Sequence, residues 1–290
     1  MKKFELTSEF VTFLGKKLFR IKALVSFGDV AEGELGGFIE RENNLDQYGD
    51  AWVYGNARVY GDAQVSGDAQ VSGDAQVYGN AWVSGDAQVY GDAQVSGDAQ
   101  VYGNAQVYGN AQVYGDAQVY GDAQVSGDAR VSGDAWVSGD AWVSGDAWVS
   151  GDAWVSGDAR VSGDAQVYGN ARVSGDAWVS GDARVSGDAQ VSGDAQVSGD
   201  AQVYGNAQVY GDAWVQNCRD YSATSCFGSE NRTTTFFRTK DGGISVRCGC
   251  FYGTLREFRE KVKERHGDSR LAKEYLMLAD SMEFRLSKDE

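Results

Sequence analysis

Between residues 48 and 215 the hydrophobic and polar positions repeat every six residues: Tyr or Ser, Gly, Asp or Asn, Ala, a variable residue, and Val. The unit occurs 28 times without an insertion. Ala and Val alternate with residues that are polar or variable, which is the period of a strand with one buried face. Gly tolerates a positive φ, so Gly-Asp and Gly-Asn favour tight bends. The pattern predicts short strands joined by corners, whose Ala and Val are buried only when successive coils stack.

The spacing of aliphatic and small residues, as in Val53 with Ala57 and Val59 with Ala63, resembles the hexapeptide-repeat family of left-handed parallel β-helices. That resemblance implies three units in each triangular turn, stacking of residues 18 apart, and a left-handed coil. We therefore predict an all-β solenoid, a left-handed triangular parallel β-helix of about nine turns. The expected domains are an N-terminal β cap at 1–47, the β-helix at 48–215 and a C-terminal module at 216–290.

The N-terminal flank predicts strands near 10–14 and 18–24, joined by a turn at Gly15. Such a segment is expected because an open solenoid end exposes backbone groups and an apolar column. Its Phe-Gly-Asp-Val segment at 27–30 and its Gly-Gly pair at 36–37 are similar to the opening of uncharacterised bacterial and phage hexapeptide-repeat proteins. Some of those proteins are labelled polymer-forming cytoskeletal, and the resemblance implies no activity.

The C-terminal flank predicts a small α+β module, a β-hairpin followed by two helices. Two strand-like segments, 233–239 and 244–250, enclose a turn that contains Gly-Gly. Thr254 and Glu257 have the spacing of a capping box at the start of a helix that ends at Gly267. An apolar stripe then predicts the second helix.

The acidic charge of the chain lies in the repeats. They hold 22 Asp and 5 Arg, a net charge of −17, whereas the whole chain carries −16. Because Asp recurs at one place in the unit, we expect three ridges of carboxylates along the corners. The favoured explanation is that Asp suits the corner and its charge keeps the protein soluble. Cation binding and an acidic surface that imitates nucleic acid are the alternatives.

The position between Ala and Val is usually Gln, but Trp and Arg replace it at intervals. Four consecutive units carry Trp, which predicts an aromatic belt with Trp154 stacked on Trp136. On another face Trp142, Arg160 and Trp178 would stack in an order that suits cation–π contact. Exposed aromatic side chains can bind sugars, bases or another subunit, although duplication followed by drift would also produce this scatter. The candidate contact surface comprises Trp136, Trp142, Trp148, Trp154, Arg160 and Trp178.

Specific docking requires an irregular surface, which the uniform repeats lack and the C-terminal module offers. We therefore expect a protein partner to bind through this module, and a homo-oligomer is a further option. The competing interpretation is that the module only covers the last turn. The candidate interaction residues are Phe236, Phe237, Phe251, Tyr252, Arg256 and Arg259.

Nothing in the sequence predicts catalysis. Hexapeptide-repeat acyltransferases, by resemblance, use a histidine on the coil and loops that interrupt it, but the one histidine here is His266, outside the repeats. We see no phosphate loop or nucleophile motif and predict no enzyme, no cofactor and no metal. The spacings of Cys218, Cys226, Cys248 and Cys250 do not suit a zinc site, so we expect reduced thiols.

No signal peptide or membrane-spanning segment is visible, which favours a cytoplasmic protein without a membrane partner. The acidic coil is not expected to bind nucleic acid directly. The sequence thus predicts a non-enzymatic structural scaffold that spaces or displays a C-terminal interaction module. The alternatives are an acidic nucleic-acid mimic that binds a DNA-handling protein, and an unusual or degenerate hexapeptide acyltransferase.

Overall fold

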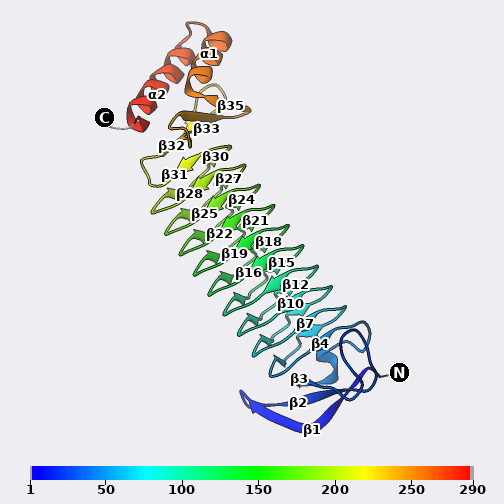
Figure 1. Ribbon diagram of the computed structural model, residues 1–290. Helices are drawn as coiled ribbons and strands as arrows, with labels where there is room; N and C mark the ends of the chain where they lie inside the picture. Colours follow the sequence, from blue (N-terminus) through cyan, green and yellow to red (C-terminus); the bar gives the residue numbers. More distant parts are fainter. Residues whose placement is uncertain (1, 288–290) are drawn as a thin grey trace. The chain divides into compact units, whose positions relative to one another are not determined.

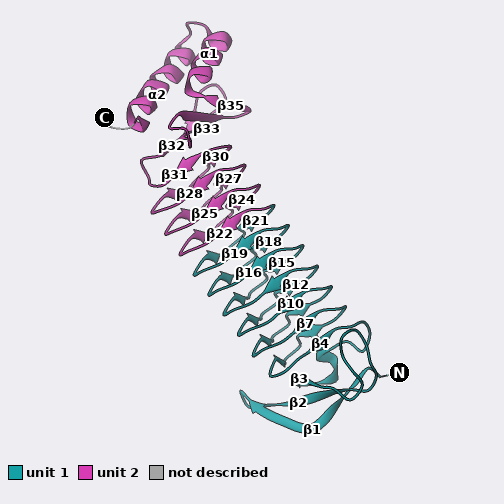
Figure 2. Ribbon diagram, in the orientation of Figure 1, with its two compact units in different colours: residues 1–157 teal, residues 158–290 magenta. Residues whose placement is uncertain are grey.

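The structure is a computed structural model that describes residues 2–287 (Figure 1). The chain forms two compact units, residues 1–157 and 158–290 (Figure 2). The boundary lies within the repeats, between β21 (Trp154–Val155) and β22 (Arg160–Val161). Each coil of a solenoid contacts only its neighbours, so every coil has the same kind of surroundings. The repeat sequence therefore does not predict where the chain divides. The two units are described separately below.

In the N-terminal unit each repeat contributes one two-residue strand, from β4 (Trp52–Val53) to β21 at intervals of six residues. From β4 to β18 each strand pairs in parallel with the strand three units later, so Val71 pairs with Val53 on one side and with Val89 on the other. Three strands therefore make one turn, and each turn contributes a strand to three separate parallel sheets. The predicted stacking interval of 18 residues is confirmed.

The Ala and Val side chains of the repeats are fully buried, and the predicted assignment of inside and outside is confirmed. Each strand is only two residues long, although backbone pairing continues past the strands. The N–H groups of Gln124, Ser126 and Asp128 each donate to a carbonyl of the next turn at 2.9 Å. The last of these bonds lies in the corner, so the coils are joined by hydrogen bonds around most of the perimeter.

The corners require glycine for two reasons, as Gly127 illustrates. Its φ is +68°, which L side chains rarely adopt. A Cβ at this position would also lie 3.0 Å from the backbone nitrogen of Gly145 in the next turn. Successive coils can therefore stack closely at their corners only where the glycine position of each corner lacks a side chain.

The N-terminal flank forms β1 (Phe4–Phe13), β2 (Lys16–Ala23) and β3 (Leu35–Ile39), followed by the 3₁₀ helix η1 (Glu42–Asn44). β1, β2 and β3 pair antiparallel in that order, and β3 then pairs in parallel with β5 (Arg58–Val59). Asn44 donates through Nδ2 to the carbonyls of Gly61 and Ala63 at 3.0 and 2.8 Å. These contacts satisfy the open end of the first coil, as a cap must.

The C-terminal unit begins with further repeat strands, β22 to β31 (Trp214–Val215), which pair in the same register. An antiparallel sheet follows, formed by β32 (Tyr221–Phe227), β33 (Arg232–Arg238), β34 (Ile244–Cys248) and β35 (Phe251–Thr254). The predicted hairpin corresponds to β33 and β34, whereas β32 and β35 were not predicted. Two helices complete the unit, α1 (Leu255–His266) and α2 (Arg270–Leu286).

The sheet of the C-terminal module has two covered faces. Phe236 and Val246 lie on the face that packs against α1 and α2. Thr235 lies on the opposite face of β33, where its Oγ1 accepts a hydrogen bond at 3.0 Å from the backbone of Gln208 in the last turn of repeats. Arg247 donates to the Gln208 side chain at 3.1 Å. The module therefore covers the last turn of its own unit while its helices remain on the outside.

Candidate functional site

Trp52 is buried against Phe4 and Phe27 of the N-terminal cap, whereas the other Trp residues of the repeats are exposed on the outside of the coil. Trp136, Trp142, Trp148 and Trp154 are 38–42% exposed. Trp154 is the registered neighbour of Trp136, and their ring centroids lie 5.5 Å apart with an interplanar angle of 69°. The predicted stacking position is confirmed, although the rings meet edge to face. In the C-terminal unit Arg160 is likewise the registered neighbour of Trp178.

Most of these Trp side chains are anchored by a serine that the sequence interpretation overlooked. The indole Nε1 groups of Trp142 and Trp148 each donate at 3.1 Å to the hydroxyl of Ser126 and Ser132, sixteen residues earlier. These serines are only 5% exposed because the indoles cover them. The same bond recurs at Trp82, Trp154 and Trp178. The variable positions are thus coupled across turns. In the sequence this coupling is indicated by a Ser that precedes a Trp by sixteen residues.

Tyr takes a different partner at the same offset. The hydroxyl groups of Tyr60 and Tyr90 each donate to the side chain of the Gln sixteen residues later. Tyr rings also stack on one another one turn apart, as Tyr90 does on Tyr108 with centroids 5.0 Å apart. Where Tyr120 precedes Trp136, the two rings instead pack edge to face at 6.4 Å. The outward side chains of successive turns therefore contact one another in ways that differ with their identity.

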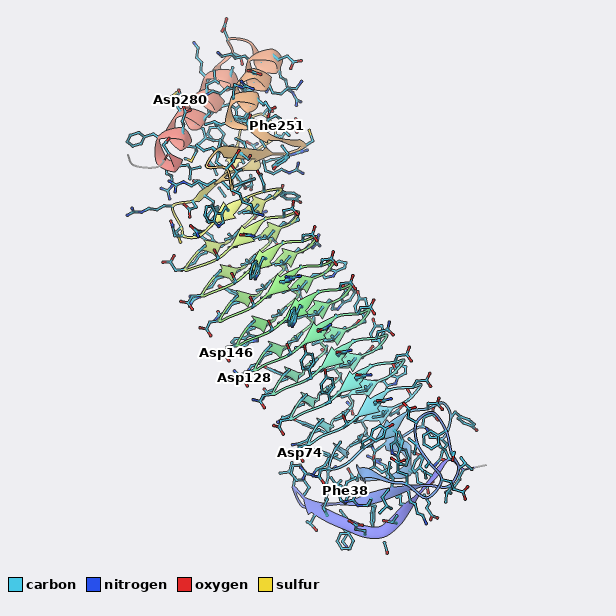
Figure 3. The ribbon with its side chains drawn as sticks, in the orientation of Figure 1. Phe38, Asp74, Asp128, Asp146, Phe251 and Asp280 are labelled. Atoms are coloured by element: carbon cyan, nitrogen blue, oxygen red, sulfur yellow. The ribbon has the colours of Figure 1, made fainter. Side chains whose placement is uncertain are left out.

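The Asp residues form exposed ridges along the corners, as predicted. Figure 3 shows Asp74, Asp128 and Asp146 along one edge of the N-terminal unit. Asn at the same position donates to the Asp one turn later, for example from Asn110 to Asp128 at 2.8 Å. An Asn within a ridge therefore replaces repulsion between carboxylates by a hydrogen bond. The described residues contain no group of three or more His, Cys, Asp or Glu side chains that could hold a metal ion.

Two of the candidate interaction residues are not on the surface. Phe236 and Phe237 are 0% exposed. Phe236 packs edge to face on Phe258 of α1, with ring centroids 5.8 Å apart. Phe237 lies on the other face of β33, toward the last turn of repeats. Both side chains are buried, because the helices cover one face of the sheet and the last turn of repeats covers the other. We therefore correct the predicted surface by removing them from it.

The remaining candidates have different roles. Arg259 joins the two helices, because its guanidinium binds Asp280 and Glu283 of α2 at 2.6 Å each. The hydrogen bond to Glu283 raises the pKa of Arg259, so this side chain stays charged. Arg256 is exposed, and within residues 2–287 its one ion pair is with Glu260 at 3.9 Å. Arg256 is thus free to meet a partner, whereas Arg259 is held within the protein.

Tyr252 is 44% exposed, and its hydroxyl lies 3.4 Å from a carboxylate oxygen of Asp212. Burial and that nearby carboxylate raise the pKa of Tyr252. Sequence reasoning overlooked the outer face of α2, where Met277 is 72% exposed and Phe284 is 90% exposed. These two residues are seven apart and therefore lie on the same face of the helix. They are the most exposed large apolar side chains of the module.

A hollow of about 100 Å³ opens on the same module. Phe258, Val262 and Tyr275 form its buried floor, and Phe227 and Phe251 form its half-buried sides. Its rim carries several charged side chains, and one of its edges is the turn between β34 and β35. The residues at the rim and this edge are Ser229, Glu230, Arg232, Cys248, Gly249, Cys250, Lys261, Arg265 and His266.

The hollow has a rigid wall on the side of α2. The Tyr275 hydroxyl accepts a hydrogen bond from the backbone nitrogen of Ser229 at 3.1 Å. Gly228 lies against the same ring, and a Cβ there would be only 1.7 Å from the hydroxyl oxygen. His266 stacks on the Tyr275 ring with centroids 5.7 Å apart. The single histidine of the chain thus packs within the module, close to this hollow.

The cysteines of the described residues form no disulfide. Cys248 is half-buried and accepts a hydrogen bond at 3.2 Å from the Thr234 hydroxyl. Cys218, Cys226 and Cys250 are exposed. Among the residues that the structure describes, no helix combines the length and apolar character needed to cross a membrane.

Parallel two-residue strands that pair at a constant interval define the protein as a β-solenoid repeat protein. A family model described as YdcK Beta solenoid repeat matches twelve segments of the repeats. Each segment spans seventeen residues, close to one observed turn: 51–67, 69–85, 75–91, 87–103, 93–109, 99–115, 105–121, 111–127, 123–139, 165–181, 177–193 and 201–217.

The chain is therefore similar to the YdcK family over residues 51–67, 69–139, 165–193 and 201–217, whereas residues 140–164 and 194–200 of the repeats and both flanks lie outside the matches. No curated protein matches the chain. The left hand of the coil, and the closer resemblance to hexapeptide-repeat and polymer-forming proteins, remain predictions.

Proposed function

We propose that this β-solenoid is a non-enzymatic scaffold whose C-terminal module binds a protein partner. The observation that carries the proposal is the outer face of α2, where Met277 and Phe284 expose large apolar side chains on a small folded module. Apolar residues that are exposed together are typical of contact surfaces. Arg256 adds an exposed cationic side chain on α1.

The uniformity of the repeats supports the same division of roles. A partner that contacts only the recurring Gly, Asp, Ala and Val would find several equivalent registers along the coil. The module occurs once in the chain, so a partner can bind to it in one position only. Its sheet also covers the last turn of repeats, so a single module serves as both a cap and a binding surface.

The absence of catalysis is part of this proposal. His266 packs on Tyr275 within the module, which gives this histidine a structural role in the C-terminal unit. The Asp residues of the repeats are equivalent and exposed, so no single carboxylate is distinguished as a base. Saturable binding of acetyl-coenzyme A that depends on one of these Asp residues would overturn this part of the proposal.

The main test compares three forms of the full chain. Proteins cross-linked to the parent are compared with those cross-linked to a variant lacking residues 84–101, which is one turn at the observed interval. The third form carries Met277→Ser and Phe284→Ser. We expect the turn deletion to retain the captured partner and the double substitution to lose it.

The opposite outcome would favour the acidic repeats as the binding surface. Capture would then weaken when turns are removed and would persist after the double substitution. A captured protein that normally binds DNA would, in that case, support the nucleic-acid mimic. Circular dichroism of each variant checks that folding is preserved.

A further inference from the structure

The hollow of the C-terminal module is too small for a cofactor and large enough for one side chain. Its volume is about 100 Å³. Sites for whole small-molecule ligands usually measure about 300–1,000 Å³, whereas a cavity of about 150 Å³ holds a benzene molecule. A single aliphatic or aromatic side chain therefore suits this hollow in size. Its floor of Phe258, Val262 and Tyr275 suits such a side chain in polarity.

The rim of the hollow is basic, although the chain as a whole is strongly acidic. Arg232, Lys261 and Arg265 lie around the opening, with Glu230 as the one carboxylate. Lys261 forms an ion pair with Glu264 at 2.7 Å. Arg232 and Arg265 have no ion pair among the residues that the structure describes. Two guanidinium groups are thus available for carboxylates next to an apolar group in the hollow.

We infer that the hollow binds an acidic peptide segment of a partner protein, with one apolar side chain inserted as an anchor. Carboxylates on either side of the anchor pair with Arg232 and Arg265. This inference rests on the proposed function, because it names the chemistry of the partner that the module binds. The apolar floor favours such a segment over a nucleic acid, because the polar edges of a nucleobase would be buried there without hydrogen-bond partners.

The charges of the repeats and of the rim have opposite effects on the binding of an acidic segment. The negative charge of the repeats opposes any acidic partner at a distance. Charges on the protein surface are screened over about 8 Å at physiological ionic strength, so the rim dominates once the segment is in contact. Added salt should weaken binding, because the contacts with Arg232 and Arg265 are exposed to solvent.

The test selects peptides from a random library displayed on phage, with the full chain as the target. Selected peptides are then measured by fluorescence anisotropy. We expect them to combine acidic residues with one apolar residue, and replacement of that apolar residue by Gly to abolish binding. The double variant Arg232→Gln with Arg265→Gln should bind about tenfold more weakly. Lys263→Gln is the matched control, because Lys263 is an exposed cation on the same helix that does not line the hollow.

The position of the bound peptide is measured separately by alkylation of thiols. Cys250 borders the hollow and is exposed, whereas Cys218 is exposed and does not border it. A peptide in the hollow should slow the alkylation of Cys250 and leave that of Cys218 unchanged. Mass spectrometry of the two peptides that contain these residues provides the readout.

Several outcomes would overturn the inference. Failure to select peptides, selection of basic peptides, or equal binding by the double variant and the parent would each do so. Binding of single-stranded DNA that is lost in the double variant would assign the rim to nucleic acid. Self-association abolished by both the double variant and Phe284→Ser would assign the hollow to a second copy of the chain. In contrast, partner capture that depends on Phe284 but not on Arg232 and Arg265 would leave the proposed function standing without this site.

Discussion

The repeats and the C-terminal module bury their apolar residues in different ways. In the repeats each Val pairs with the equivalent Val one turn away, so the core is built from residues at one fixed interval, as Val53, Val71 and Val89 show. In the module Phe236, Phe258 and Tyr275 come from a strand and two helices with no common spacing. A regular coil yields a surface of repeated features, whereas an irregular module yields features that differ from one another, such as the hollow beside Tyr275 and the exposed apolar face of α2. Specific recognition is therefore expected where the packing is irregular.

The largest effect should follow a charge placed inside the coil. Val113 is fully buried in β14 (Gln112–Val113), so Val113→Asp puts an unpaired carboxylate into the apolar column. We expect a loss of more than about 4 kcal/mol in the free energy of unfolding. Urea unfolding followed by circular dichroism measures it. The adjacent outward residue provides the control Gln112→Asp, which should unfold close to the parent, and equal loss in both variants would contradict the assigned orientation.

The next largest effect tests the fit between a turn and a helix in the module. A Cβ at Gly228 would overlap the Tyr275 hydroxyl, and the φ of +74° adds strain. Gly228→Ala should destabilise the module by about 3 kcal/mol, while the repeats keep their stability. Gly242→Ala is the matched control, because its φ is +83° and no atom lies within 4 Å of the added Cβ. It should cost only about 1 kcal/mol.

Hydrogen exchange of the module and of the repeats separates the local effect of Gly228→Ala from a global one. We expect faster exchange in β32, β33 and α2 and no change in the repeat strands. Faster exchange throughout the C-terminal unit would show that the module and the repeats unfold together, and the contrast between the two regions would then not extend to their stability.

A smaller effect tests whether the variable positions of the repeats are coupled. Ser132 is covered by the Trp148 indole and accepts its N–H at 3.1 Å. Ser132→Tyr should displace the indole and cost about 1 kcal/mol. Ser72→Tyr is the control, because Gln88 follows it at the same offset, as Gln76 follows Tyr60. Thermal unfolding compares the two, and equal melting temperatures would favour drift without coupling.

The last prediction concerns Lys3 in the N-terminal cap, which is 4% exposed and donates to the Ala51 carbonyl at 2.9 Å. Burial lowers the pKa of Lys3 to about 8, against the opposing effect of nearby Asp residues. Between pH 8 and 10.5 the unfolded chain keeps the proton on Lys3 while the folded protein releases it. The contribution of Lys3 to the free energy of unfolding therefore rises with pH. The gain is at most about 3 kcal/mol and should be apparent between pH 8 and 9.5.

Urea unfolding at several pH values measures this dependence, and Lys3→Met should remove it. The window ends below pH 10 because Tyr60, whose pKa is raised to about 12 mainly by burial, acts in the opposite direction above it. Equal pH dependence in Lys3→Met and the parent would show that other groups are responsible.

The sequence by itself determined the coil. The repeat predicted inward Ala and Val, outward Asp ridges, pairing at 18 residues, and the position of Trp154 beside Trp136, because each of these depends only on a short local pattern and its copies. It also predicted the hairpin of β33 and β34 and the capping box of α1, which are local features as well. The two-residue length of the strands and the Ser–Trp bonds depend on contacts between turns, so they required the structure.

Only the tertiary structure decided the module. Phe236 and Phe237 are aromatic residues of a kind common in contact surfaces, but the two helices cover Phe236 on one face of the sheet and the last turn of repeats covers Phe237 on the other. Arg259 is of a residue type common in docking surfaces, but it forms ion pairs with Asp280 and Glu283 of α2. The hollow beside Tyr275 combines side chains from β32, β35, α1 and α2. Such a site depends on contacts between residues far apart in a sequence that never repeats, and no local pattern encodes which of them will meet.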